Sequence, residues 1–142
     1  LEAAAQEFLD GSSSPEPYEF QLETGNRARG SPVSLDFRPM IRQILEELVC
    51  RAPQPLIAAR FHATMVAAIA SVCRRMQAEL GLDRVCLSGG CFQNAILLQG
   101  AVETLRAEGF QVFIHREVPA NDGGISLGQA AIACEVLAAR PS

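Results

Sequence analysis

The sequence predicts an α/β domain in which an antiparallel hairpin precedes a parallel β-α-β unit and several packed helices. A short apolar run at Val85–Leu87 ends in a glycine pair, and a helical pattern begins at about Phe92. A second apolar run follows at Val112–Ile114. About 25 residues from one run to the next is the spacing of parallel strands joined by a crossover helix. Because the first run lacks alternation, we expect its strand to be covered on both faces.

The bulk composition limits the class of protein. The chain has 142 residues, of which 49% are hydrophobic, so it can bury one substantial core. The net charge is −4 and no basic patch is present, which argues against a nucleic-acid partner. No run of about 18 apolar residues occurs, so we expect no transmembrane helix and no membrane partner. The first residues lack a signal-peptide pattern, and we expect a cytoplasmic protein.

Five cysteines contribute little to the predicted function. They are Cys50, Cys73, Cys86, Cys91 and Cys134. No CxxC pair is present, so we expect buried, reduced thiols rather than a zinc site. Cys91 follows Gly90 at a predicted helix start, a setting that lowers a thiol pKa. No base is placed beside Cys91 in the sequence, so a structural thiol is favoured over a nucleophile.

The N-terminal part predicts a helix end and then a hairpin. Residues 1–16 have the pattern of the tail of a preceding helix and a linker, and residues 17–142 have the pattern of one domain. Apolar and polar residues alternate over Tyr18–Leu22 and again over Val33–Phe37, which predicts two half-buried strands. A polar connection around Asn26–Gly30 joins them.

Three further helices complete the expected fold. Helical periodicity predicts Pro39–Arg51 and a long, alanine-rich helix Pro55–Leu80 that ends at Gly81. A last helix begins near Ile125. We expect its apolar residues to be mostly buried, namely Ile125, Leu127, Ala131, Cys134, Val136 and Leu137.

Two glycine turns follow the two predicted parallel strands. Ser88–Gly90 leaves the first strand, and Asn121–Gly124 follows the second and opens the last helix. Ligands of parallel sheets bind beyond the carboxyl ends of the strands, which lie at one edge. Free N–H groups at a glycine turn and helix start suit phosphate, although such glycines also make plain tight turns. Two such turns at one edge favour a nucleotide or phosphate site.

Three motifs resemble one known family. LSGGCFQN at Leu87–Asn94, the block from Gly109 to Ala130 and RFHAT at Arg60–Thr64 resemble the carboxyl end of the hydrogenase-maturation carbamoyltransferase family, HypF. The similarity runs from about Tyr18 to Leu137. It implies the second lobe of the two-lobed actin/Hsp70/sugar-kinase-like (ribonuclease H-like) fold, which is similar to that of the universal tRNA threonylcarbamoyl-transfer protein.

The resemblance also implies a chemistry. The family uses carbamoyl phosphate and ATP to form carbamoyl-adenylate, and then carbamoylates a C-terminal cysteine of a partner hydrogenase-maturation protein. That group becomes the cyanide ligand of the nickel–iron hydrogenase. The two metal-binding histidines and the adenylate-forming domain of the family have no counterpart in this sequence. We therefore expect a divalent metal (iron, zinc or magnesium) shared with a first lobe, and no activity from this chain alone.

The resemblance assigns roles to particular residues, and each has a plainer alternative. The nucleotide contacts are Ser88, Gly89, Gly90, Asn94 and Gly123. Asn94 offers an amide that donates and accepts, but an early-helix asparagine is also satisfied locally. Asp122 is the expected metal ligand, and its alternative is a helix N-cap. His62 is either a ligand or interlobe contact or a packed residue with one hydrogen bond. Catalytic residues are not identified.

Two other classes of function remain open. A sugar-kinase or Hsp70-like ATPase lobe explains the glycine turns but not the NDGG-x-x-LGQA block. A non-catalytic domain that docks the partner maturation protein is the third class.

Overall fold

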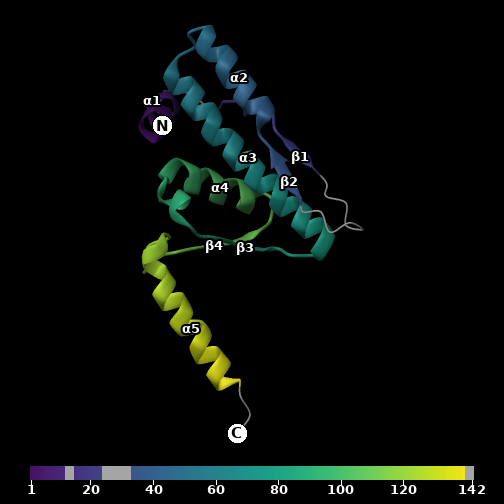
Figure 1. Cartoon of the computed structure of the whole chain (residues 1–142), viewed down its shortest axis with the longest axis vertical. Helices are drawn as coiled ribbons and strands as arrows, with labels where there is room; N and C mark the ends of the chain where they lie inside the picture. Colours follow the sequence, from purple (N-terminus) through teal and green to yellow (C-terminus); the bar gives the residue numbers. More distant parts are fainter. Residues whose placement is uncertain (12–14, 24–32, 140–142) are drawn as a thin grey trace.

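The structure is a computed structural model that describes residues 1–11, 15–23 and 33–139. Its elements follow the chain as a helix, a hairpin, two helices and a β-α-β unit that leads into a last helix (Figure 1). The bounds are α1 Glu2–Leu9, β1 Gln21–Glu23, β2 Ser34–Asp36, α2 Arg38–Val49, α3 Gln54–Leu80, β3 Arg84–Leu87, α4 Ala95–Ala107, β4 Gln111–Ile114 and α5 Ile125–Ala138. Two short 3₁₀ helices, η2 Gly90–Gln93 and η3 Asp122–Gly124, precede α4 and α5.

The predicted hairpin is confirmed, but its first strand covers only Gln21–Glu23. Tyr18–Phe20 lies outside the strand, and the N–H of Tyr18 donates to Oγ1 of Thr64 on α3 instead of a neighbouring strand. Strands β1 and β2 pair antiparallel, with Leu22 opposite Leu35. The predicted connection Asn26–Gly30 lies outside the described residues, as do residues 12–14 of the predicted linker.

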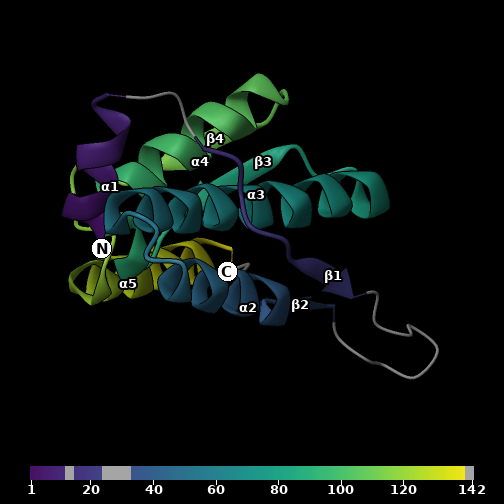
Figure 2. The ribbon, with the colours of Figure 1, turned by 90° about the horizontal axis from the view of Figure 1, so that it is seen from above.

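Helix α3 is the centre of the described structure, and α1 and α4 pack against it (Figures 1 and 2). Gly81 ends α3 in the left-handed conformation at φ 69°, as the sequence predicts. The buried Ala5 of α1 packs against Ala58 and Ala59 of α3. These small side chains allow the two helices to approach closely. Helix α1 is thus packed on the body of the chain, while the predicted boundary at residue 16 stays a prediction.

Helix α3 is also long and apolar enough to cross a membrane, by length and composition alone. The core helix of a soluble protein passes the same test. Our expectation rested on the absence of an unbroken apolar run, whereas mean hydropathy over a window ignores the few polar residues that interrupt α3. The absence of a membrane partner stays a prediction.

The parallel β-α-β unit is confirmed, with Val85 of β3 opposite Val112 of β4. One face of this sheet packs on α3 and α4 around the buried residues Ala101 and Leu105. The prediction that β3 is covered on both faces is wrong for the described residues. Cys86 and Phe113 point to the other face and are exposed, Phe113 by 52%. Within the described chain, helices cover only one side of this sheet.

The helix after β3 begins later than predicted. Instead of starting near Phe92, the chain makes the 3₁₀ turn η2, and α4 starts at Ala95. Asn94 separates the two because its backbone is extended and its side chain accepts a hydrogen bond from the N–H of Leu97. An asparagine N-cap therefore sets the start of the helix.

The predicted burial of α5 is wrong. All of its residues from Ile125 to Ala138 are exposed, and Figure 1 shows the helix projecting away from the other elements. Its residues are apolar on all sides, which is typical of a helix that is enclosed by neighbours. In the described structure α5 makes few contacts beyond the turn η3 that precedes it.

Candidate functional site

The two glycine turns meet at one edge of the sheet, as predicted. The N–H of Gly89 donates to the carbonyl oxygen of Ala120 over 2.8 Å. Ser88 Oγ lies 2.9 Å from Nε2 of His115, which follows β4. These two contacts tie the turn after β3 to the loop after β4. The parallel register of the strands places them together.

The two glycines of the first turn differ in backbone conformation, and only one of them has a conformation that favours glycine. Gly89 has φ +107°, a conformation that strains any residue with a side chain. Gly90 has no positive φ, and a Cβ built on it would meet nothing within 4 Å. Neither backbone strain nor crowding within the described chain therefore requires glycine at position 90.

The same turn presents two free donors. The N–H groups of Gly90 and Cys91 open the 3₁₀ turn η2, so no earlier carbonyl of that turn can accept from them. Neither donates to another group in the part of the chain that the structure describes. Adjacent free N–H groups of this kind form a concavity that suits a phosphate oxygen.

A small cavity lies beside this turn. It measures about 260 Å³ and lies between Phe92 and Gln93 on one side and the loop His115–Ala120 on the other. A pocket that encloses a whole small ligand usually exceeds about 300 Å³. The described residues thus enclose less space than a complete site for a small ligand needs.

Asn94 stands at the end of the turn and makes two hydrogen bonds within the chain. Its Oδ1 accepts from the N–H of Leu97 over 2.9 Å, and its Nδ2 donates to Nε2 of His62 over 2.9 Å. A carboxamide has two donor hydrogens and two acceptor lone pairs. One donor and one acceptor of Asn94 are left over after the local contacts.

His62 is a packed residue in this structure. Its side chain is on α3, and the residue is 4% exposed. Nδ1 donates to the carbonyl oxygen of Ala58 over 2.8 Å, and Nε2 accepts from Asn94. Since both ring nitrogens are engaged, neither is free to bind a ligand here. The geometry favours the packed alternative, with two hydrogen bonds instead of one.

The second turn differs from the expectation for Asp122. The residue that caps η3 is Asn121, whose Oδ1 accepts from the N–H of Gly123 over 3.0 Å. Asp122 is exposed, and its side chain makes no hydrogen bond or ion pair with any described residue, while its carbonyl oxygen accepts from the N–H of Ile125. Its carboxylate is therefore not used as a cap.

The glycines after Asp122 have a local explanation. A Cβ on Gly124 would lie 2.9 Å from the carbonyl oxygen of Pro119, and one on Gly123 would lie 3.1 Å from Oδ1 of Asn121. The sequence favoured a nucleotide or phosphate ligand at this turn. The loop itself crowds both positions, so Gly123 and Gly124 do not by themselves indicate one.

The donor set for a metal is incomplete in the part of the chain that the structure describes. Among the described residues, no three His, Cys, Asp or Glu side chains gather to hold an ion. Asp122 offers two hard oxygen donors that suit a divalent cation. The carboxylate fits the role of one ligand in a site whose other ligands come from elsewhere.

One polar contact at this edge was not predicted. The N–H of Ala95, at the start of α4, donates to Oε1 of Glu2 on α1 over 2.6 Å. A carboxylate of this chain thus sits at the positive end of α4, where the sequence suggested phosphate. The partners are 93 positions apart in the sequence, so no local signal could reveal the contact. The free donors lie one turn earlier, at Gly90 and Cys91.

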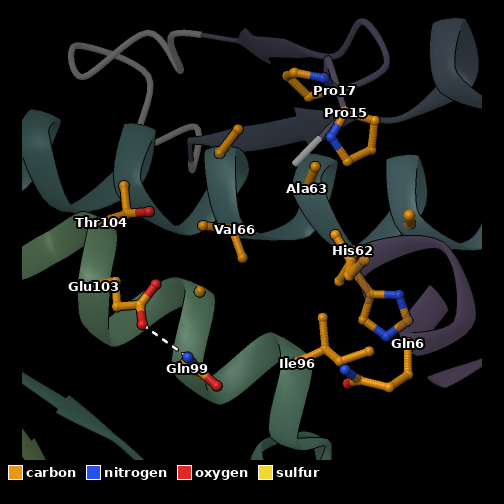
Figure 3. A pocket seen from close by; sticks show the side chains of 14 residues that line it. Gln6, Pro15, Pro17, His62, Ala63, Val66, Ile96, Gln99, Glu103 and Thr104 are labelled. Atoms are coloured by element: carbon orange, nitrogen blue, oxygen red, sulfur yellow. Dashed lines mark hydrogen bonds between the residues drawn. The ribbon is translucent and has the colours of Figure 1, made fainter. Parts of the chain in front are cut away.

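A larger cavity lies away from the glycine turns. It measures about 530 Å³ and lies between α1, α3 and α4. Figure 3 shows His62, Gln6 and Ile96 at one end and Thr104 at the other. Pro15 and Pro17 also line it. Its wall is mostly apolar and contains no residue of the SGG or NDGG turns.

The RFHAT motif fastens the N-terminal segment to α3. Thr64 Oγ1 accepts from the N–H of Tyr18 over 2.8 Å and donates to the carbonyl oxygen of Arg60 over 2.7 Å. The Arg60 guanidinium lies over the Tyr18 ring and pairs with Glu47, and Nε donates to the carbonyl oxygen of Glu16. Burial and the hydrogen bond to Glu47 raise the pKa of Tyr18 well above its ordinary value.

The cysteines are all reduced, and four of them are exposed. Only Cys73 is half-buried, and burial raises its thiol pKa. The expectation of buried thiols is wrong for Cys50, Cys86, Cys91 and Cys134. Cys86 is exposed because it lies on the uncovered face of the sheet.

The fold and the site define the class of protein as an α/β domain with two glycine turns joined at the carboxyl edge of a parallel strand pair. Comparison with known proteins gives the family. The family described as "Carbamoyltransferase, Kae1-like Domain, second subdomain" matches residues 1–129, and the chain belongs to it.

Relatives agree with this assignment. The chain is 41% identical over 105 residues to carbamoyltransferase HypF of Rhizobium leguminosarum bv. viciae, covering 73% of this chain and 13% of that protein. It is 38% identical over 97 residues to carbamoyltransferase HypF of Synechocystis, covering 68% of this chain and 12% of that protein. The chain thus spans about an eighth of the length of these relatives.

The solved structures agree as well. A crystal structure of full-length HypF in the phosphate- and nucleotide-bound form superposes with a TM-score of 0.81 at 37% identity. It covers 89% of this chain and 16% of that one. HypF of T. kodakarensis shares the fold, with a TM-score of 0.68 at 23% identity.

Proposed function

We propose that this chain is the nucleotide- and metal-contacting C-terminal lobe of a carbamoyltransferase that acts in hydrogenase maturation. The complete protein uses carbamoyl phosphate and ATP, passes through carbamoyl-adenylate, and carbamoylates a C-terminal cysteine of a partner maturation protein in the cytoplasm. Membership of the carbamoyltransferase family and likeness to a nucleotide-bound HypF support the proposal. The chain forms the second lobe of an actin/Hsp70-like pair in this proposal.

The observation that carries the proposal is the SGG turn. Gly90 is a glycine that nothing in the described chain requires, and it stands beside two free N–H donors. These donors and Ser88 Oγ suit phosphate oxygens, while Gly89 gives the turn its shape. Asn94 keeps a donor and an acceptor for the nucleoside, and Gly123 belongs to the opposite turn.

Asp122 is the metal ligand in this proposal. Its carboxylate is exposed, without a partner among the described residues, and located in the loop that Ala120 ties to the SGG turn. The divalent metal, when bound, supplies positive charge that compensates phosphate. What this chain contributes is one hard oxygen ligand and a fixed loop that carries it.

The proposal is tested by Gly90→Ala in the full-length protein that carries the chain. Alanine fits the backbone of position 90 and meets no atom, so the melting temperature should stay unchanged. The added methyl group stands where the ligand approaches. We expect ATP affinity and carbamoyl transfer to fall by about tenfold or more, the scale of a lost charge-assisted contact.

Gly11→Ala is the matched control, because position 11 is equally open and belongs to α1's end rather than the turn. It should leave affinity and transfer unchanged. Full ATP affinity and full transfer in Gly90→Ala would overturn the nucleotide role of this turn.

Asp122→Asn tests the metal role separately. Since Asn121 carries the cap, stability should not change. Asparagine is an uncharged and poorer metal ligand. Metal content and carbamoyl transfer should both fall while binding of the partner maturation protein is retained. Unchanged metal content with full activity would show that Asp122 is not a ligand.

A further inference from the structure

His62 is the buried polar residue at the junction of α3 and the glycine turn. A backbone carbonyl only accepts hydrogen bonds, so the 2.8 Å contact with the Ala58 oxygen requires the proton on Nδ1. In the neutral ring Nε2 is then an acceptor, and the group of Asn94 that faces it must be the amide nitrogen. The same orientation points Oδ1 of Asn94 at the N–H of Leu97. The contacts of His62 with Ala58, of His62 with Asn94 and of Asn94 with Leu97 are thus all consistent with one orientation of the imidazole ring and of the amide.

The position of the unused donor and acceptor of Asn94 depends on that orientation of the amide. If the amide turned over, two donors would face each other at Leu97, and Oδ1 would face the lone pair of Nε2. The bonds to His62 and to Leu97 together therefore determine where the spare donor and acceptor of Asn94 stand. The backbone of Asn94 is held too, because its N–H donates to the carbonyl oxygen of Cys91 over 3.2 Å.

The neighbours of His62 in the RFHAT motif have a different task. Arg60 and Thr64 bond to the N-terminal segment and to Glu47, on the side of α3 that faces Tyr18. His62 is the member of the motif that reaches α4. The motif thus connects the N-terminal segment to the glycine turn through one helix.

We propose that His62 is a positioning residue that fixes the carboxamide of Asn94 so that its remaining donor and acceptor face the nucleoside of ATP. The inference rests on the proposed function of the SGG edge and deepens it. His62 itself does not touch the ligand, because both ring nitrogens are used and the residue is buried. A purely packing role predicts a loss of stability without a selective loss of ATP recognition.

His62→Phe and His62→Gln form the decisive pair. Both lose the bond to Ala58, but glutamine retains an acceptor that can reach the amide of Asn94, whereas phenylalanine has none. In the full-length protein, we expect His62→Phe to raise KM for ATP about tenfold, the scale of one lost hydrogen bond to a polar group. KM for carbamoyl phosphate should stay unchanged. His62→Gln should restore KM for ATP to within about threefold of the original value.

Asn94→Asp gives an independent arm. Aspartate still caps α4, but a carboxylate cannot donate to Nε2 of His62. We expect a rise in KM for ATP at least as large as in His62→Phe, because aspartate also lacks the spare donor for the nucleoside. Adding His62→Phe should cause no further rise, because that change acts only through the carboxamide of Asn94. In His62→Phe, the side-chain NH₂ resonances of Asn94 should shift while backbone resonances of α5 do not.

The outcomes separate the inference from the proposed function. Equal KM values for ATP in the Phe and Gln variants, or an unchanged KM in His62→Phe, would overturn the positioning role alone. A protein without the substitutions that neither binds ATP nor transfers a carbamoyl group would overturn the proposed function, and the inference with it.

Discussion

Helices α3 and α5 are both rich in alanine and large apolar residues, yet their surroundings differ. Helix α3 is packed by α1 and α4, and its polar residues Arg60, His62 and Thr64 are bonded to other segments. Helix α5 has no buried residue and few neighbours in the described chain. Figure 1 shows α3 in the middle of the body and α5 outside it.

The difference separates the surfaces that this chain buries by itself from the apolar surfaces that it leaves exposed. Around α3, the buried polar residues His62 and Thr64 are hydrogen-bonded, which is typical of a finished interior, and among the described residues one buried oxygen of Glu108 has no partner. At α5 and on the outer face of the sheet, large apolar side chains stay in water. Such surfaces usually meet a partner. We interpret them as surfaces that other parts of the proposed carbamoyltransferase cover.

The largest effect on stability is expected from Leu105→Ala. Leu105 on α4 is fully buried in the cluster beneath the sheet, so its removal leaves a cavity. The free energy of unfolding should fall by about 2–5 kcal/mol. Leu127→Ala on α5 is the matched control, because Leu127 is 57% exposed and its loss should change stability by less than about 0.5 kcal/mol. Urea unfolding of both variants measures this, and equal losses would contradict the comparison.

The next effect is a contrast in sign between two helix glycines. A Cβ on Gly100 of α4 would lie 2.9 Å from Cγ2 of Val66 on α3, whereas one on Gly128 of α5 would meet nothing within 4 Å. Gly100→Ala should lower the unfolding free energy by about 1–2 kcal/mol through overpacking. Gly128→Ala should raise it by about 0.5–1 kcal/mol, the gain in helix propensity.

Val66→Ala supplies the control for this pair. In that background the crowding at position 100 is absent, and Gly100→Ala should become neutral or stabilising. Thermal unfolding of the single and double variants gives the coupling energy. A destabilisation by Gly100→Ala that persists without the Val66 methyl groups would show that the close approach of α3 and α4 is not its cause.

Much of the fold could be predicted from the sequence because it depends on local patterns. Alternation gave the hairpin, helical spacing gave α2 and α3, and glycine at position 81 gave the end of α3. The boundary of α4 was missed because a 3₁₀ turn and the Asn94 cap intervene. The burial of α5 was wrong because apolar composition indicates that a helix needs partners, not whether they belong to the same chain.

The candidate site was predictable in its location and not in its contacts. Parallel strands bring Ser88 and His115 to one edge, and that follows from topology. The pairing of His62 with Asn94, and of Glu2 with Ala95, joins segments far apart in the chain. No spacing rule reveals such pairs. The distinction between Gly90, which nothing crowds, and Gly124, which Pro119 crowds, also required three-dimensional coordinates.

A smaller effect on stability depends on pH and concerns Tyr18, which is buried against α3. Tyr18 is the single tyrosine and the chain has no tryptophan, so phenolate absorbance at about 295 nm reports on this residue alone. Burial first, and then the bond to Glu47, raise its pKa in the folded state above the unfolded value of about 10. The stability that this shift contributes is full below pH 10 and is lost as pH rises further.

We therefore expect no phenolate signal from the folded chain near pH 10, and ionisation that coincides with unfolding at higher pH. The chain in concentrated urea, the control, should titrate at about 10. Tyr18→Phe should remove this tyrosine-linked loss of stability above pH 10. Ionisation near 10 in the folded chain would contradict a buried Tyr18 bonded to Glu47.

The smallest effect on folding is expected for substitutions of the exposed apolar residues of α5. Self-association of the chain is the sensitive measurement there. The triple variant Leu127→Glu, Ile132→Glu and Val136→Glu places charges on side chains that already face water, so the free energy of unfolding should barely change. Because exposed apolar surface drives association, the unmodified chain should self-associate at high concentration and the triple variant should remain monomeric.

The control is a matching stripe on α2, changed by Ile41→Glu, Leu45→Glu and Leu48→Glu. This stripe is narrower than the surface of α5, which is apolar on all sides, so its variant should still associate. Sedimentation velocity over a range of concentrations distinguishes the two variants. A monomeric unmodified chain at millimolar concentration, or loss of association only in the α2 variant, would show that α5 is not the surface that awaits a partner.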